Sequence, residues 1–303
     1  MKTCWSVLVI SLAACLLPVT AQAQTSAKLR VVATSSIIAD WVKNIAGDAV
    51  ELTVLVGPDS DVHTFEPTPA DNIELSKASL VFENGLGFEH WMDKLYRSSQ
   101  SKAKRVVLTK GVVQQPLTIY QVQQHRDEFD PHAWHNVRYA IGMVKKMAQA
   151  LIEADQVHAD IYAKNLALYE KSLQELDEWV MKATSQIPKA QRKLVTNHDS
   201  LGYFCERYQF TLIGAAFESS TTEAEDPSAQ DMANLINKIK KSGVRVVFAE
   251  NINNAKVISA VASEAKVKVA PALYTDALGG KGSPAETYLQ MIRYNVQTIV
   301  SLI

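Results

Sequence analysis

Three of the seven histidines lie where a predicted strand or loop gives way to another element. His63 occurs in GPDSDVHTFEPTP, His132 in DPHAWHN and His198 in TNHDS. Neutral imidazole is a good ligand for zinc and related divalent ions, and three imidazoles leave one position of a tetrahedral site for a carboxylate. Asp276, in LYTDALGG, follows a predicted strand and can supply that carboxylate. These four residues are therefore the candidates for a metal site.

Each candidate taken alone has a simpler interpretation. A single histidine in a loop is more often a surface or hydrogen-bonded residue than a ligand. An aspartate that precedes Gly279 and Gly280 is more often a turn residue, whose side chain satisfies local backbone groups. The case for a metal site therefore depends on whether the fold brings the four side chains together.

The predicted elements alternate between short β-branched strands and longer helices. In the first half of the chain, helices are expected at 37–46 and 88–96, each after a strand. The strands are expected at residues 29–34, 50–56, 80–83, 105–108, 193–196, 210–214, 244–249 and 267–270. Such alternation is typical of α/β folds, and here it predicts two lobes, each with a parallel sheet covered by helices. Ligands of open α/β sheets collect at the carboxyl ends of strands, so histidines from both lobes could converge in the interlobe cleft.

A long helical pattern without Gly or Pro runs through residues 157–187. About thirty residues in one helix would span about 45 Å, which is longer than one lobe needs. We interpret this segment as one long rigid α-helix that joins the lobes. The expected organisation is a signal peptide at 1–23, an N-terminal α/β lobe at 24–155, the linker helix at 156–187 and a C-terminal α/β lobe at 188–303.

The first 23 residues have the pattern of an export signal. Lys2 gives a positive start, residues 5–19 are mostly apolar, and the A-x-A site ends at Ala23. No later apolar run approaches the roughly 20 residues needed to cross a bilayer, so we expect a soluble protein of the periplasm. An alternative is LAAC, which resembles a lipoprotein processing box and would leave Cys15 acylated as a membrane anchor.

Cleavage after Ala23 leaves Cys205 as the remaining cysteine, so the mature chain can form no intramolecular disulfide. An ordinary hydrophobic core must stabilise the fold, and a composition that is 47% hydrophobic can provide one. Removal of the signal deletes one lysine and changes the formal charge from −1 to −2. This near-neutral charge and the absence of a basic block argue against a nucleic-acid partner.

Six segments, in order along the chain, resemble the metal-binding solute-binding proteins of bacterial zinc and manganese ABC transporters, a family that includes streptococcal lipoprotein adhesins. The segments are DVHTFEPTPAD at 61–71, NGLGFEHWMDKL at 84–95, DPHAW at 130–134, HDSLGYFCERYQF at 198–210, LYTDALGG at 273–280 and YLQMIRYN at 288–295. The resemblance covers essentially the whole mature chain. It implies two α/β lobes bridged by one long helix, and it implies His63, His132, His198 and Asp276 as the metal ligands.

By this resemblance the protein is an extracytoplasmic carrier that captures a divalent ion and delivers it to the membrane permease of an ABC transporter. We expect a monomer, and a periplasmic metallochaperone could load it. Manganese-binding relatives commonly have Glu at the position of His198. A site with three imidazoles and one carboxylate therefore favours Zn²⁺, with Mn²⁺ as the alternative cargo.

The alternative function classes are a secreted zinc hydrolase and a surface adhesin. A secreted zinc hydrolase would use the same histidines with a water-filled fourth position, but the sequence has no H-E-x-x-H helix, no G-x-S-x-G elbow and no P-loop. Four protein ligands would also leave no position for an activated water, so we expect no enzyme. A surface adhesin would be favoured by a lipid on Cys15 and disfavoured by cleavage after Ala23.

The second histidine of DPHAWHN departs from the family pattern, which usually has Leu or another non-ligand residue there. If Asn136 caps the next helix, His135 occupies the position before the cap, where side chains often pack against the first turn. We interpret His135 as packed or exposed, with a metal-handing or replacement ligand as the alternative. The short loop around His125 could collect metal loosely, although its few polar side chains are more simply interpreted as solvated.

Three residues near the predicted strand ends have other candidate roles. Asp199 or Glu250 could accept the second N–H of a ligand imidazole and fix its tautomer, and Asp199 could instead cap a helix starting at Ser200. Cys205 is expected to be a small buried hydrophobe. The remaining helical histidines are interpreted as surface residues: His90 and His158.

Overall fold

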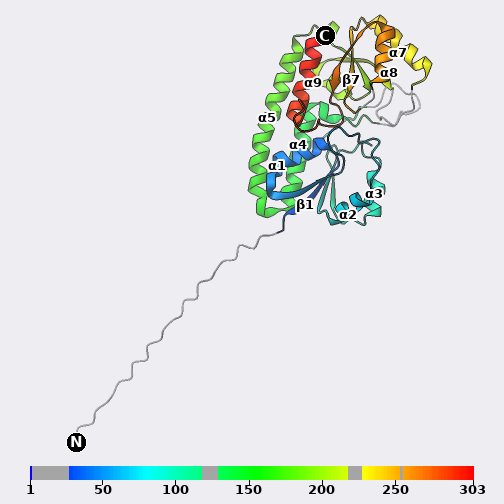
Figure 1. Cartoon of the computed structure of the whole chain (residues 1–303). Coiled ribbons are helices and arrows are strands. Elements are labelled where there is room, and N and C mark those ends of the chain that lie inside the picture. The colour runs from blue at the N-terminus through cyan, green and yellow to red at the C-terminus, as the bar shows by residue number, and fades with distance from the viewer. Residues whose placement is uncertain (2–26, 118–128, 218–226, 253–254) are drawn as a thin grey trace.

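The chain forms two parallel-sheet α/β lobes joined by one long helix, as predicted (Figure 1). The computed structural model describes Met1 and residues 27–117, 129–217, 227–252 and 255–303. The predicted signal peptide and the loop with His125 lie outside these residues, apart from Met1. Within them, no helix has the length and apolar character that a membrane span requires.

The N-terminal lobe is a four-stranded, all-parallel sheet in the order β2-β1-β3-β4. Its elements are β1 Leu29–Ala33, α1 Ser36–Ala46, η1 Gly47–Ala49, β2 Val50–Val54, α2 Pro69–Lys77, β3 Leu80–Glu83, α3 Met92–Ser98 and β4 Lys104–Val107. The strands match the predicted ones within two residues. The helix expected at 88–96 begins only at Met92: residues 85–87 have three consecutive positive φ angles of 89°, 57° and 86°, and residues 88–91 form turns.

The C-terminal lobe contains two parallel strand pairs, β5–β6 and β7–β8, with β5 lying beside β7. Its elements are η4 Lys189–Gln191, β5 Lys193–His198, α6 Gly202–Tyr208, β6 Thr211–Phe217, α7 Ala229–Ser242, β7 Val246–Glu250, α8 Lys256–Ala265, β8 Lys268–Leu273 and α9 Tyr288–Leu302. The carboxyl ends of β5 and β7 therefore lie side by side. Strand β5 ends at His198 and β7 ends at Glu250.

Four helical elements follow the N-terminal sheet in the sequence and precede the C-terminal sheet. They are η2 Ala133–His135, α4 Val137–Ala154, η3 Gln156–His158 and α5 Ala159–Ser185. The Asn136 side chain accepts from Arg138 N, which confirms the predicted cap of α4. The 27 residues of α5 span about 40 Å, and Figure 1 shows this helix running along both lobes. It packs against α1 of the first lobe and against α9 beside the second.

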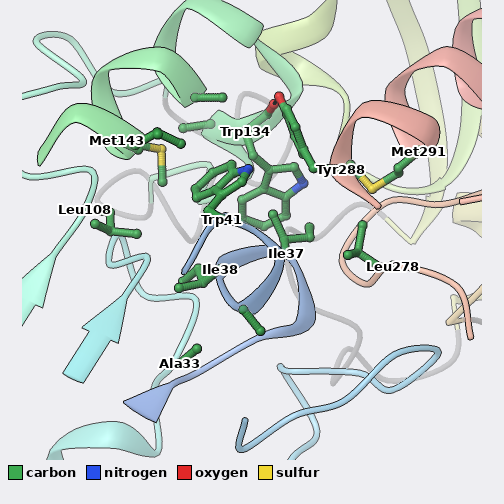
Figure 2. Packing of buried hydrophobic residues seen from close by; sticks show 14 of the residues in the cluster. Ala33, Ile37, Ile38, Trp41, Leu108, Trp134, Met143, Leu278, Tyr288 and Met291 are labelled. Carbon is green, nitrogen blue, oxygen red and sulfur yellow. Dashed lines mark hydrogen bonds between the residues drawn. The ribbon is translucent and has the colours of Figure 1, made fainter. Parts of the chain in front are cut away.

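One large hydrophobic core extends across the junction of the lobes, and a smaller core lies beneath α7 and α8. Figure 2 shows Trp41, Trp134 and Tyr288 packed together in the large core. The rings of Trp41 and Tyr288 meet edge to face with 5.3 Å between centroids, which joins α1 to α9. The inner face of the C-terminal lobe is therefore built on the same core as the N-terminal lobe.

Candidate metal centre

The four candidate side chains converge from separate segments at the junction of the lobes. His63 lies in the loop after β2, His132 directly before η2, His198 at the end of β5, and Asp276 in the loop after β8. All four are buried, with 0% relative exposure. One ligand atom from each lies within 4.8 Å of those from the other three. The fold thus brings together residues that are up to 213 positions apart in sequence.

The spacing of these atoms suits one small divalent ion. Asp276 Oδ2 lies 3.3 Å from His63 Nε2 and 3.2 Å from His198 Nε2, while Asp276 Oδ1 lies 3.4 Å from His132 Nε2. The Nε2 atoms of His132 and His198 are 3.4 Å apart. Ligand atoms bound at 2.0–2.1 Å in a tetrahedron are separated by about 3.3 Å. Each of these four separations therefore agrees with that between two ligands of a tetrahedral centre.

Carboxylates fix the orientation and tautomer of two imidazoles. His132 Nδ1 is 2.7 Å from Asp130 Oδ1, and His198 Nδ1 is bonded to Glu250 Oε2. An ionised carboxylate can only accept a hydrogen bond from Nδ1–H, so in each neutral ring Nε2 carries the lone pair. Two lone pairs that face one another at 3.4 Å cannot hydrogen-bond to each other. A shared cation satisfies both.

His63 is held differently from the other two histidines. Its ring packs edge-on against Phe88, with 4.9 Å between centroids, and its backbone N–H donates to Asp61. Among the described residues, both ring nitrogens of His63 and both carboxylate oxygens of Asp276 have no hydrogen-bond partner. Burial of polar atoms without partners is costly, and a bound divalent ion would satisfy atoms of both residues.

The charges around the site favour a cation. Burial opposes protonation of His132, but the charge of Asp276 and the contact with Asp130 outweigh it and raise the His132 pKa to about 9. Burial likewise opposes protonation of His198, whose pKa is nevertheless raised well above its ordinary value by Glu250 and Asp276. A divalent ion would take over the role of these protons, because bound imidazole must be neutral.

His135 lies outside the four-residue cluster. It is buried with 1% exposure, and burial lowers its pKa to about 3, so the ring is neutral. The ring contributes to the wall of a small cavity, together with Leu201 and Val296. The environment of His135 agrees with the packing interpretation, and its Nε2 has no hydrogen-bond partner among the described residues.

The carboxylate roles were only partly predicted. Glu250 does accept from a candidate ligand imidazole, as expected. The expectation that Asp199 caps a helix at Ser200 is wrong, because Ser200 N donates to His198 O in a turn and α6 begins at Gly202. Burial raises the Asp199 pKa to about 6. The imidazole partner that sequence reasoning missed is Asp130, although its spacing of two residues from His132 offered a signal.

The other predicted surface and core residues lie as follows. Cys205 is buried, and burial raises the pKa of its thiol, in agreement with a hydrophobic role. His90 is exposed, as predicted. His158 is half-buried, and its Nδ1 lies 2.7 Å from Asp155 Oδ2. Neither His90 nor His158 belongs to the candidate metal centre.

Comparison with known proteins gives consistent matches over nearly the whole chain. Residues 31–302 match the family described as zinc-uptake complex component A, periplasmic. The manganese-binding lipoprotein MntA of Halalkalibacterium halodurans is 33% identical, over 99% of this chain and 98% of that protein. The manganese ABC transporter substrate-binding lipoprotein ScaA of Streptococcus gordonii is 31% identical, over 96% of this chain and 94% of that protein.

Solved structures give a match of the same extent. The periplasmic zinc-binding protein TroA from Treponema pallidum aligns with a TM-score of 0.83 at 30% identity, over 91% of this chain and 99% of that chain. The similarity thus includes both lobes, the long helix and the region of the four candidate ligands.

Proposed function

Because the chain belongs to the zinc-uptake component A family of periplasmic metal-binding proteins, we propose that it captures one zinc ion and delivers it to a membrane permease. The coarser function follows from the family: the protein is a metal-binding, extracytoplasmic substrate-binding component of an ABC transporter, and it is not an enzyme. The finer proposals concern the ligands, the ion and the anchoring of the chain.

The convergence of His63, His132, His198 and Asp276 is the observation that carries the proposal. In the proposed site, each of the three histidines binds the ion through Nε2 and the aspartate binds it through carboxylate oxygen. Three imidazole nitrogens and one carboxylate, buried and each nitrogen 3.2–3.4 Å from a carboxylate oxygen, are a donor set that suits tetrahedral zinc. All four positions would be filled by protein, as a carrier requires.

Manganese is the second candidate, and two observations favour it. MntA and ScaA carry manganese in their names. In addition, Asp276 directs Oδ1 toward His132 and Oδ2 toward His63 and His198, so both carboxylate oxygens face the centre. A harder ion with more than four ligands could use both oxygens.

A competition titration tests the ligand assignment. Chelator-stripped mature protein is mixed with zinc and excess manganese, desalted, and analysed for bound metal. We expect one zinc per chain to be retained. If the protein holds neither ion, the four residues do not form a metal site and the proposed function fails; if it holds manganese equally well, the zinc preference is wrong.

Affinity alone does not identify the cargo, because zinc binds more tightly than manganese to most nitrogen and oxygen sites. The second measurement is therefore uptake of radioactive zinc and manganese by cells that lack the protein. A zinc carrier requires zinc uptake to fall while manganese uptake stays normal. The reverse result would assign the protein to manganese.

The anchoring of the chain is tested separately. MntA and ScaA are named lipoproteins, which supports acylation of Cys15 over release by cleavage after Ala23. Mass spectrometry of the protein from membranes and from the soluble extracytoplasmic fraction distinguishes the two. A lipid-modified Cys15 at the N-terminus indicates an anchor, and a chain starting near Gln24 indicates release. In either form we assign the lobes to 24–155 and 188–303.

A further inference from the structure

Thr275, which precedes Asp276, is completely buried and uses each of its polar groups. Its hydroxyl donates to Glu250 Oε2 at 3.2 Å. Its carbonyl accepts from Trp134 Nε1 at 2.9 Å, and its backbone N–H donates to Asn251 Oδ1 at 3.4 Å. The backbone that carries the Asp276 carboxylate is thus fixed at the preceding residue in three directions.

The hydroxyl of Thr275 connects two candidate ligands of the C-terminal lobe. Glu250 Oε2 accepts from this hydroxyl and also from His198 Nδ1. The other oxygen, Oε1, accepts from the backbone N–H groups of Asn197 and His198 at 3.0 and 3.1 Å. One buried carboxylate therefore links the segment of His198 to the segment of Asp276.

The carbonyl of Thr275 makes a second connection, toward the N-terminal lobe. Its donor Trp134 lies two residues after His132, and the two rings pack with 5.3 Å between centroids. The carbonyl of Trp134 accepts from Tyr288 OH at 2.6 Å. Through these bonds the backbone beside Asp276 is also fixed relative to the His132 ring.

We propose that Thr275 is a positioning residue that sets the distance between Asp276 and His198 by holding Glu250 through its hydroxyl. This inference rests on the proposed metal-binding function, because it assigns Thr275 a role in the same site. Thr275 itself does not contact the ion. Residues that orient metal ligands in this way typically change metal affinity by about 10- to 100-fold when they are replaced.

Thr275→Val tests the hydroxyl selectively, because Val has nearly the same shape and leaves both backbone bonds of residue 275 intact. Without the hydroxyl, Glu250 Oε2 keeps His198 as a donor but loses the bond to the Asp276 segment. We expect zinc affinity, measured by competition with a chromogenic chelator, to fall about 10- to 100-fold. Thr275→Ser retains a hydroxyl and should bind within a few-fold of the wild type.

Thr184→Val is the matched control. Thr184 is also buried, at 2% exposure, and its hydroxyl donates to Val180 O within α5. Its loss should leave zinc affinity unchanged. Thermal unfolding of each metal-free variant shows whether the fold is retained. If Thr275→Val does not fold, Thr275→Ala removes the hydroxyl without adding a second methyl beside Glu250 and carries the same expectation.

A double-mutant cycle separates positioning through Glu250 from a general packing role. In a Glu250→Gln background, Thr275→Val should cost much less affinity than in the wild type, because the bond it removes is already altered. Full additivity, or wild-type affinity in Thr275→Val, overturns the proposed role. If the wild type itself binds neither zinc nor manganese, the proposed function fails as well, which distinguishes the two failures.

Discussion

The two lobes hold their histidines by the same chemistry at different ranges. In the N-terminal lobe His132 is oriented by Asp130, two residues earlier, which also accepts the His132 backbone N–H. In the C-terminal lobe His198 is oriented by Glu250, 52 residues later on another strand. A short turn is sufficient for the first arrangement, whereas the second requires that β5 and β7 lie side by side.

His63 adds a third arrangement within the N-terminal lobe. Among the described residues no carboxylate accepts from its Nδ1, and the ring packs edge-on against Phe88. The four candidate ligands are therefore not held in equivalent ways. Three belong to segments that are hydrogen-bonded through Asp130, Glu250 and Thr275. His63 is instead positioned by the packing of its ring on Phe88 and by the backbone bond to Asp61.

We expect the greatest loss of zinc affinity when a ligand histidine is replaced, and little loss when the neighbouring histidine is replaced. His132→Ala should weaken zinc binding by orders of magnitude, because it removes one of four ligands. His135→Ala should change zinc affinity little, because His135 lies outside the cluster. Isothermal titration in the presence of a competing chelator measures both. Equal losses would show that the two histidines of DPHAWHN have been assigned wrongly.

A buried carboxyl in the N-terminal lobe provides a contrast with Glu250. Glu89 accepts from Thr34 Oγ1 at 2.7 Å and from the N–H groups of Asn84 and Gly85, all of them neutral. Burial raises its pKa from 4.5 to about 7. The folded state therefore holds this proton more tightly than the unfolded state does, and the stability that it contributes is lost as pH rises from about 4.5 to 7.

Glu89→Gln removes that titration. The free energy of unfolding of the wild type, relative to the variant, should fall across this pH window by an amount on the order of 3 kcal/mol. Urea unfolding of the metal-free proteins at several pH values measures the difference. A difference that stays constant between pH 4.5 and 7 would show that Glu89 is ionised in the folded state throughout.

Replacement of the two orienting carboxylates compares how much each lobe's carboxylate contributes to zinc affinity. Asp130→Asn and Glu250→Gln should each weaken zinc binding by about 10- to 100-fold. The larger loss is expected for Glu250→Gln, because Glu250 also accepts from two backbone N–H groups and from Thr275. Glu153→Gln, at an exposed carboxylate bonded to Lys104, is the control. A larger loss in Asp130→Asn would reverse the ranking.

Contacts between the lobes, made to the loop that follows Asp276 and to Asn251, give a smaller, kinetic effect. Asp59, at the exposed end of an N-terminal-lobe loop, accepts from Asn251 Nδ2 at 3.1 Å and from Gly280 N at 2.8 Å. Its φ of 51° is tolerated by Asn, so Asp59→Asn keeps the backbone and weakens the charged acceptor. We expect a severalfold faster release of zinc to a chelator in stopped flow. Exposed Asp48→Asn should release zinc at the wild-type rate.

Much of the fold could be predicted from the sequence, because hydrophobic periodicity and strand length are local properties. Glu250 could also be proposed as an imidazole partner, since it directly follows the strand predicted at 244–249. Asp130 was missed because its stretch has the composition of a solvated loop, although its spacing of two residues from His132 was a signal for the contact. Thr275 could not be found, because its hydroxyl acts through a carboxylate on another strand.

The smallest expected effect concerns the relative position of the lobes. The long helix α5 is bonded at both ends: Asn165 donates to Ile45 O of α1, and Asp177 pairs with Arg207 of α6. The continuous large core adds to this restraint. Metal-free and zinc-loaded protein should therefore have the same radius of gyration in solution scattering.

Under this expectation, release depends on the loop that contains Asp276. Near its start, Thr275 is bonded to Asn251 and Glu250 of its own lobe. Toward its end, Leu278 N donates to Ser36 Oγ of the other lobe. Opening of the bond between Leu278 and Ser36 alone would free one side of the site without rotating a lobe. A clear expansion of the metal-free protein would contradict this and would instead indicate bending at α5.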